Sequence, residues 1–319
     1  MSHNEYGGYI EYENYLGKCF HNEALGLNCG RNCLAYLIET KGIKKIYLPY
    51  FLCISVENVC KKYHVEIQYY NVDINFIPKI KYKIKQDEWL YIVNYYGQIK
   101  NEIIREWKEK YPNLIVDNSQ AYFQMPVDDV DTIYTCRKYF GVADGAFLYT
   151  DKQKSEGLEQ DYSYERMHFL LGRYEKGASE FYSEYVANNE QFQNAPILKM
   201  SKLTRNLLNG INYSGVEELR TENFTVLHNL LEKYNLLKLS IPKGAFMYPL
   251  YIKNGAMIRK HLLEKKIYIP VLWPDVLDKC DNSTLEYDMA ENILPIPVDQ
   301  RYDVDDMKYI VEVIERCID

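Results

Sequence analysis

The sequence predicts an α/β protein in which helices cover both faces of a largely parallel sheet. Over the first two-thirds of the chain, short apolar runs alternate with helical stretches, as they do in α/β folds. The runs KIYLPYF and WLYIVNYYGQ are apolar along their length rather than at every second residue, which indicates strands covered on both faces. A length of 319 residues with 47% apolar content allows two domains and a sizeable core. We expect a large α/β domain at 1–205 and a small α+β domain at 206–319.

The order of the elements follows from these runs and from the residues at which they stop. The helix NCLAYLIETKG ends at Gly42, and the strand KIYLPYF stops near Pro49, because glycine closes helices readily and proline cannot donate a ladder hydrogen bond. Helices are expected at 32–42, 54–64, 100–110, 255–265 and 303–317, with helix-prone runs around 160–190 and 215–237. Strands are expected at 45–51, 65–73, 89–98, 113–116, 247–252, 266–271 and 293–298, and on both sides of the loop that holds Lys138.

Charge and cysteine usage exclude several classes of protein. The net charge of -7 argues against a nucleic-acid or anionic-membrane partner. None of the 8 cysteines forms a CxxC pair or a Cys/His cluster with zinc spacing, so we expect no metal site. The chain shows neither an N-terminal apolar signal segment nor a transmembrane run. We therefore expect a reduced, cytoplasmic protein.

Asp117 and Lys138 are the leading candidates for catalytic residues. LIVDNSQAYF (114–123) is a strand-like run that reaches Asp117, and the next strand leads into a loop with Lys138. Pyridoxal phosphate (PLP) chemistry needs a lysine that forms a Schiff base and a carboxylate that keeps the pyridinium nitrogen protonated. Apolar neighbours and Arg137 are expected to lower the pKa of Lys138 through desolvation and like charge. The alternatives are a solvated surface lysine, and an aspartate that caps a helix or forms a structural ion pair.

Three further residues are candidates for the rest of a cofactor site. Gly30 lies in the turn NCGRNCL, which enters a helix, and backbone amides at a helix start bind a phosphate. Thr135, at the end of its strand, adds a hydroxyl for the same phosphate, and Gln120 is placed to reach the ring oxygen. The alternatives are an ordinary helix start, a β-branched strand residue and a surface amide.

Several motifs then occur in one specific order: GRNCLAYLI (30–38), YLPYFLCISV (47–56), IVNYYGQ (92–98), VDNSQAYF (116–123) and YTCRKYFGVADGAFL (134–148). Together they resemble the DegT/DnrJ/EryC1 family of PLP-dependent sugar aminotransferases, which has the type I aminotransferase fold. IYIPVLWP (267–274) and LPIPVDQRYDVDDM (294–307) resemble that family's small domain and final helix. The resemblance covers most of the chain and implies a large PLP-binding domain followed by a small C-terminal one.

The resemblance also implies roles for individual residues. Lys138 matches the Schiff-base lysine, Asp117 the pyridinium partner and Gln120 the glutamine near the ring hydroxyl. The other implied cofactor-binding positions are Gly30 and Arg31 in the phosphate turn, Thr135 beside it, Asn94 where many members carry His, and Cys53 where members carry an aromatic ring on the cofactor face. The chain departs from the family at Cys53, and its segment NGINYSGVEELR (209–220) matches the usual Asn-Tyr-Arg stretch only loosely.

These observations predict a PLP-dependent aminotransferase that moves an amino group from glutamate to a keto sugar through a Lys138 aldimine. The resemblance implies a nucleotide-linked sugar, a role in polysaccharide biosynthesis or secondary metabolism, and a homodimer. Three alternatives come from other classes. They are a PLP-dependent sugar dehydratase, a non-catalytic ligand-binding member of the same fold, and an unrelated α/β binding module. Dehydratase relatives replace the lysine with histidine, so Lys138 favours the aminotransferase.

Overall fold

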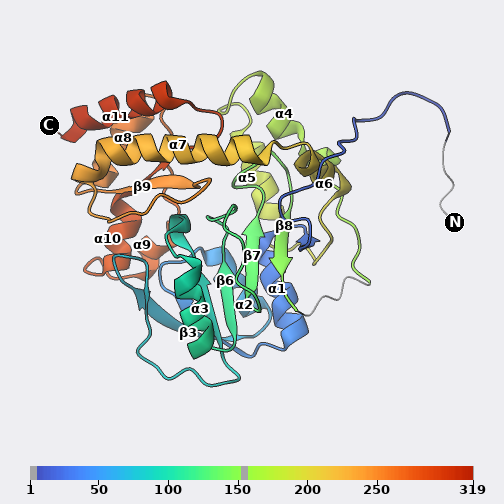
Figure 1. Cartoon of the computed structure of the whole chain (residues 1–319), viewed down its shortest axis with the longest axis horizontal. Coiled ribbons are helices and arrows are strands. Elements are labelled where there is room, and N and C mark those ends of the chain that lie inside the picture. Colours follow the sequence, from blue (N-terminus) through green and yellow to red (C-terminus); the bar gives the residue numbers. More distant parts are fainter. Residues whose placement is uncertain (1–5, 152–156, 319) are drawn as a thin grey trace.

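The computed structural model describes residues 6–151 and 157–318, and its centre is an eight-stranded sheet (Figure 1). The strand order is β1-β8-β7-β6-β5-β2-β3-β4. The contacts among β3, β2, β5, β6 and β7 are parallel, whereas β1, β8 and β4 pair antiparallel with their neighbours. The strands are β1 Leu25–Leu27, β2 Lys45–Pro49, β3 Glu66–Val72, β4 Pro78–Lys79, β5 Trp89–Val93, β6 Leu114–Asp117, β7 Asp131–Thr135 and β8 Ala146–Tyr149. The predicted, largely parallel α/β sheet is confirmed.

Helices cover both faces of this sheet, as the continuous apolar strands predict. The crossover from β2 to β3 and the crossover from β5 to β6 step in opposite directions along the sheet. Right-handed connections therefore put α2 (Ile54–Lys62) and α3 (Asn101–Lys110) on opposite faces. Helix α1 (Gly30–Lys41) packs beside α2, and its Gly42 cap has a φ of 67°, the left-handed conformation that suits glycine.

The C-terminal part of the chain builds a second core on the long helix α7, Tyr213–Leu231 (Figure 1). Phe224 and Leu227 of α7 pack against β9 and β10, a two-stranded antiparallel sheet. The other elements are β9 Met247–Tyr251, α8 Gly255–Glu264, α9 Asp275–Lys279, α10 Leu285–Asn292, β10 Ile293–Pro297 and α11 Val304–Ile318. The domain boundary at 205/206 stays a prediction.

Several expected elements differ from the observed ones. The predicted strand at 266–271 is wrong: Lys266 has a φ of 59°, Pro270 lacks a backbone N–H, and the segment packs irregularly through buried Ile267 and Ile269. By contrast, the run at 89–98 was expected to be a buried strand that ends in a turn, and this is confirmed by β5 up to Val93 and the 3-10 turn Tyr95–Gly97. The helix-prone run at 160–190 is split into α4 (His168–Glu175) and α5 (Tyr182–Gln191). The sequence patterns missed β1, β4, α6 (Lys202–Asn209), α9 and α10.

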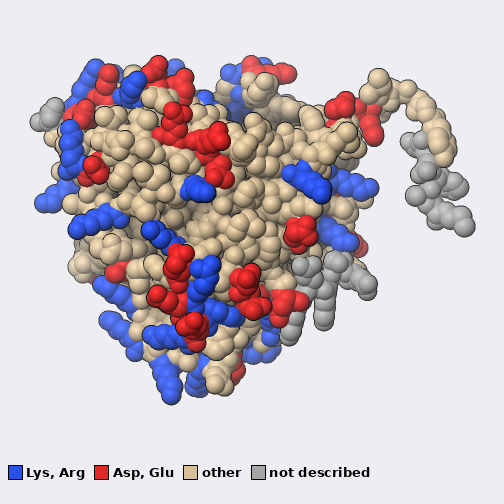
Figure 2. Space-filling view, in the orientation of Figure 1, with Lys and Arg blue, Asp and Glu red and all other residues tan. Residues whose placement is uncertain are grey.

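The distribution of charge and the character of the helices bear on possible partners. On the face shown in Figure 2, acidic and basic side chains of the described residues are interspersed rather than gathered into one basic area. Within residues 6–151 and 157–318, no helix combines the length and apolar character that crossing a bilayer requires.

Candidate functional site

The candidate site lies at the carboxyl edge of the parallel strands, where open α/β sheets bind ligands. Asp117 ends β6 in register with Val93 of β5 and Ile133 of β7, so it lies at the middle of this edge. Helix α1 begins beside the end of β7. A Cβ atom on Gly30 would lie 2.8 Å from Cγ2 of Thr135, so only glycine lets the helix start approach this closely.

Two hydrogen bonds orient the carboxylate of Asp117. Its Oδ2 accepts from the Tyr91 hydroxyl at 2.8 Å, and its Oδ1 accepts from the Ser119 backbone N–H at 2.8 Å. Tyr91 is buried, and burial together with the charge of Asp117 raises its pKa well above the ordinary value, so the tyrosine stays a neutral donor. Sequence reasoning did not single out Tyr91, because a tyrosine inside an apolar strand looks like any other core residue. The held carboxylate suits a ligand N–H such as a protonated pyridine ring.

Lys138 lies in a single tight turn that follows β7. The backbone N–H groups of Tyr139 and Phe140 both donate to the Cys136 carbonyl at 2.9 Å. The lysine side chain is exposed, and its Nζ lies 5.6 Å from the centroid of the Phe246 ring, just before β9. The expected desolvation of Lys138 is therefore wrong for this chain, because its apolar neighbours turn inward while the lysine faces the space between the sheet edge and the C-terminal core.

The start of α1 forms an anion-binding environment with the end of β7. The N-cap residue Cys29 provides no side-chain cap for the first turn. Beside it, the Oγ1 atom of Thr135 is buried and has no hydrogen-bond partner among the described residues. A buried hydroxyl without a partner costs free energy unless a ligand satisfies it. An oxyanion at this position would satisfy both the hydroxyl and the helix start.

Two guanidinium groups add positive charge on the same side. Arg31 donates from Nη1 to the Asn189 carbonyl at 3.0 Å, and Arg137 donates to the Asn189 side chain. The Arg137 guanidinium also lies 4.8 Å from the centroid of the Phe192 ring. Sequence reasoning treated Arg137 only as a neighbour of Lys138, since nothing in the primary pattern shows that α5 brings it toward Arg31.

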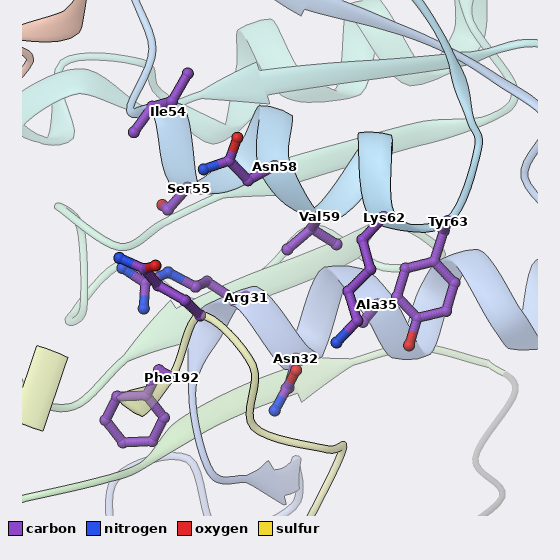
Figure 3. A pocket seen from close by; sticks show the side chains of 11 residues that line it. Arg31, Asn32, Ala35, Ile54, Ser55, Asn58, Val59, Lys62, Tyr63 and Phe192 are labelled. Atoms are coloured by element: carbon purple, nitrogen blue, oxygen red, sulfur yellow. The ribbon is translucent and has the colours of Figure 1, made fainter. Parts of the chain in front are cut away.

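A small cavity of about 70 Å³ lies between α1 and α2 and is lined by Arg31. Figure 3 shows Arg31 between Ser55 of α2 and the ring of Phe192, with Asn58 and Lys62 further along α2. This volume is well below the roughly 300 Å³ of ordinary ligand pockets. It has room for a few waters or an oxyanion and not for a whole cofactor.

The remaining predicted residues lie at the same edge with their side chains engaged. Gln120 is buried, and its Oε1 accepts from the Tyr96 backbone N–H at 2.8 Å. The Asn94 amide is used within its own turn, since its Oδ1 accepts from the Ile99 N–H at 2.9 Å and its nitrogen donates to Asn118 at 3.0 Å. Cys53 is the half-buried N-cap residue of α2, with Sγ 3.1 Å from the Ser55 hydroxyl. The cofactor contacts of these three residues stay predictions.

Comparisons with known proteins bear on the fold. No family model matches the chain, and no curated protein matches it. Among solved structures, the sugar aminotransferase CalS13 from Micromonospora echinospora matches with a TM-score of 0.62 at 12% identity, over 92% of this chain and 87% of that one. A DegT DnrJ EryC1 StrS aminotransferase from Brucella abortus gives 0.61 at 14% identity, over 92% and 85%. NtdA from Bacillus subtilis, with its bound cofactor PMP, gives 0.61 at 16% identity, over 92% and 72%.

Each of these matches extends over 92% of this chain. Their identities of 12 to 16% are too low to carry an activity, and what they establish is the architecture. The chain has the fold of these three proteins, among them the sugar aminotransferase CalS13.

Proposed function

We propose that this protein is a PLP-dependent aminotransferase and a divergent member of the DegT/DnrJ/EryC1 family. One observation carries the proposal: an oriented carboxylate, Asp117, and an exposed lysine, Lys138, share a sheet edge with the unsatisfied Thr135 hydroxyl at a helix start. Each group suits a different part of PLP, namely the ring nitrogen, the aldehyde and the phosphate. The fold shared with sugar aminotransferases supports the same conclusion.

The chain's own residues divide the work of binding. PLP supplies an electron sink for the negative charge that develops when a proton leaves the substrate carbon. Asp117 accepts a hydrogen bond from the protonated ring nitrogen, and Tyr91 keeps the carboxylate in place. Thr135 and the first N–H groups of α1 bind the phosphate, and Arg31 and Arg137 balance its charge. We assign Gln120, Asn94 and Cys53 to the surroundings of the ring.

Lys138 has two roles in this proposal. Its amine would be the attachment point for the cofactor, and the same amine would hold and move the proton at the substrate carbon. An exposed lysine on a short turn is free to make this exchange. Glutamate is the proposed amino donor, and a nucleotide-linked keto sugar is the proposed acceptor. The proposed pathway is polysaccharide biosynthesis. We also propose a cytoplasmic homodimer.

The first test is a visible absorption spectrum of the purified protein with PLP, before and after glutamate is added. We expect a band of lysine-bound PLP that converts to the band of the pyridoxamine form. Borohydride reduction followed by peptide mass spectrometry should locate the attached PLP at Lys138. Lys138→Ala should lose both the band and transaminase activity, while Lys260→Ala, a change at an exposed lysine of α8, should keep both.

The outcomes of this test distinguish the proposed aminotransferase from the other functions. A lysine-bound band that does not respond to glutamate would point to another donor or another PLP reaction. Failure of the wild-type protein to bind PLP, or full activity in Lys138→Ala, would contradict the proposal.

A further inference from the structure

Arg220 in α7 is a buried cation that the proposed chemistry does not use. Only 1% of its surface is exposed. Its hydrogen-bond partners are neutral oxygens: Gln300 Oε1 at 2.8 Å, the Ala245 carbonyl at 2.9 Å, the Tyr139 carbonyl at 3.2 Å and the Phe246 carbonyl at 3.4 Å. Burial lowers its pKa, because it penalises the charged form. A charged group held in this way is costly, so its partners indicate what it does.

These partners surround the turn that carries Lys138. Tyr139 follows Lys138 directly, and its carbonyl accepts from both Arg220 and, at 2.8 Å, the Gln300 side-chain amide. The Arg220 guanidinium also lies 4.6 Å from the centroid of the Tyr139 ring. At its other end, the Tyr139 hydroxyl accepts from the Tyr122 N–H at 3.2 Å. Tyr139 is thus fixed at both ends while the neighbouring lysine is free to move.

The same guanidinium holds the segment that faces Lys138. Phe246, whose ring lies beneath the lysine Nζ, offers its carbonyl to Arg220, and its ring centroid lies 5.8 Å from that of Tyr139. A planar guanidinium presents several donors in a fixed arrangement, which a lysine ammonium cannot reproduce. Arg220 therefore joins the two sides of the space into which Lys138 points. One side is the lysine turn at the sheet edge, and the other is the segment just before β9.

We propose that Arg220 is a positioning residue that holds the Cys136–Phe140 turn against the segment before β9 and so sets where the Lys138 amine lies. The inference rests on the proposed function for the role of Lys138. Arg220 itself touches neither the lysine nor the proposed cofactor site. It acts through the Tyr139 carbonyl and the Phe246 backbone.

The test compares two substitutions on neighbouring positions of α7. Arg220→Met keeps an unbranched, flexible side chain but removes the guanidinium and all of its donors. Thr221→Val removes the hydrogen bond that the Gly244 N–H donates to the Thr221 hydroxyl at 2.8 Å. This bond also joins α7 to the segment before β9, but it does not involve the turn that carries Lys138. Arg220→Lys keeps the positive charge but lacks the planar set of donors that a guanidinium presents. The first readout, on protein without PLP, is hydrogen exchange of residues 136–142. The second is the rate at which added PLP becomes attached to Lys138, trapped with borohydride and located by mass spectrometry.

We expect Arg220→Met to speed exchange in the lysine turn and to slow attachment by a factor on the order of ten to a hundred, because small misplacements of a reacting group have effects of this size. Attachment of PLP to Arg220→Lys should remain slow, and Thr221→Val should behave as the wild type in both hydrogen exchange and PLP attachment. Gln300→Leu removes the second donor to the Tyr139 carbonyl and the acceptor of the Arg220 Nε–H, but leaves the other Arg220 bonds. It should show a smaller change in the same direction, and it replaces Arg220→Met as the test if that variant does not fold.

Equal effects of Thr221→Val and Arg220→Met would overturn the proposal, since Arg220 would then only dock α7. Recovery in Arg220→Lys would overturn it as well, since charge rather than geometry would then matter. If wild-type protein attaches no PLP, the proposed function fails, and the exchange comparison alone still decides whether Arg220 fixes the turn.

Discussion

At the scale of single residues, the candidate site is distinguished by groups left without partners and by groups held in place. Thr135 has a buried hydroxyl that no described residue satisfies, whereas Thr132, also on β7, donates to the Val130 carbonyl at 3.0 Å. Two threonines on one strand therefore differ in what their hydroxyls do. The contrast allows the phosphate role of Thr135 to be separated from its role in packing.

Thr135→Val is expected to affect stability and cofactor binding in opposite directions. Without PLP, removal of an unsatisfied buried hydroxyl should leave the free energy of unfolding unchanged or raise it by about 1 kcal/mol. The affinity for PLP should fall by roughly tenfold, as one hydrogen bond to a charged phosphate is lost. Urea unfolding and a spectroscopic PLP titration measure the two quantities.

Thr132→Val is the matched control, because its hydroxyl is satisfied within the strand. It should destabilise the protein by about 1 kcal/mol and leave PLP affinity unchanged. If Thr135→Val binds PLP as the wild type does, Thr135 has no part in phosphate binding.

At the scale of elements, a polar link as well as packing holds α9 against α2 in the main core. Glu57 of α2 forms ion pairs with Lys61, at 2.6 Å, and with Lys279 of α9. Burial opposes ionisation of Glu57, but the hydrogen bonds from Lys279, Lys61 and Tyr69 outweigh it and lower the pKa to about 2. This link holds α9 beside α2, the helix whose N-cap residue is Cys53.

Glu57→Gln is expected to lower the free energy of unfolding at neutral pH by about 2 kcal/mol, allowing for screening by solvent. Because the pKa in the folded protein is lowered from 4.5 to about 2, the stabilisation is fully present above pH 4.5 and is lost as the pH falls toward 2. Unfolding of both proteins in urea at pH 7 and pH 3 measures this difference. If the difference in unfolding free energy between variant and wild type is the same at pH 7 and pH 3, the assigned ion pair is contradicted.

At the scale of the whole molecule, one buried histidine ties the N-terminal segment to the centre of the fold. His21 is fully buried, with Nε2 2.8 Å from the Tyr122 carbonyl and Nδ1 3.1 Å from the Tyr149 hydroxyl. Its ring centroid lies 4.0 Å from that of Tyr134. Burial lowers its pKa to about 4, although the bond to the Tyr122 carbonyl acts in the opposite direction.

This histidine is expected to make the whole fold sensitive to mild acid. Its pKa is 6.5 when unfolded and about 4 when folded, so between these values the unfolded chain binds more protons. The free energy of unfolding should therefore fall as the pH drops below 6.5, by about 3 kcal/mol in total by pH 4. Unfolding curves for the wild type and His21→Asn at pH 7 and pH 4.5 measure the effect. A wild-type loss as small as that of His21→Asn would show that other groups govern the acid response.

Much of the fold was predictable from local patterns. Continuous apolar runs identified the parallel strands, and Gly42 and Pro49 marked where elements end. Short or irregular elements were missed, because β1 and β4 are too short to show a period. Ile267 and Ile269 made an irregular segment look like a strand, although its isoleucines are buried by the C-terminal core and not by strand pairing. Apolar patterns report that a residue is buried and not by which partner.

The sequence by itself determined which chemical groups the site contains, because Asp117, Lys138 and Gly30 stand in motifs that place them at strand ends and a helix start. Only the tertiary structure decided how these groups are held. Tyr91 meets Asp117 across neighbouring strands, Asn189 brings Arg31 and Arg137 together, and Arg220 reaches the lysine turn from 81 residues away along the chain. The physical reason is that hydrogen bonds and burial depend on distance in space, and contacts between distant segments leave no periodic trace in the order of residues.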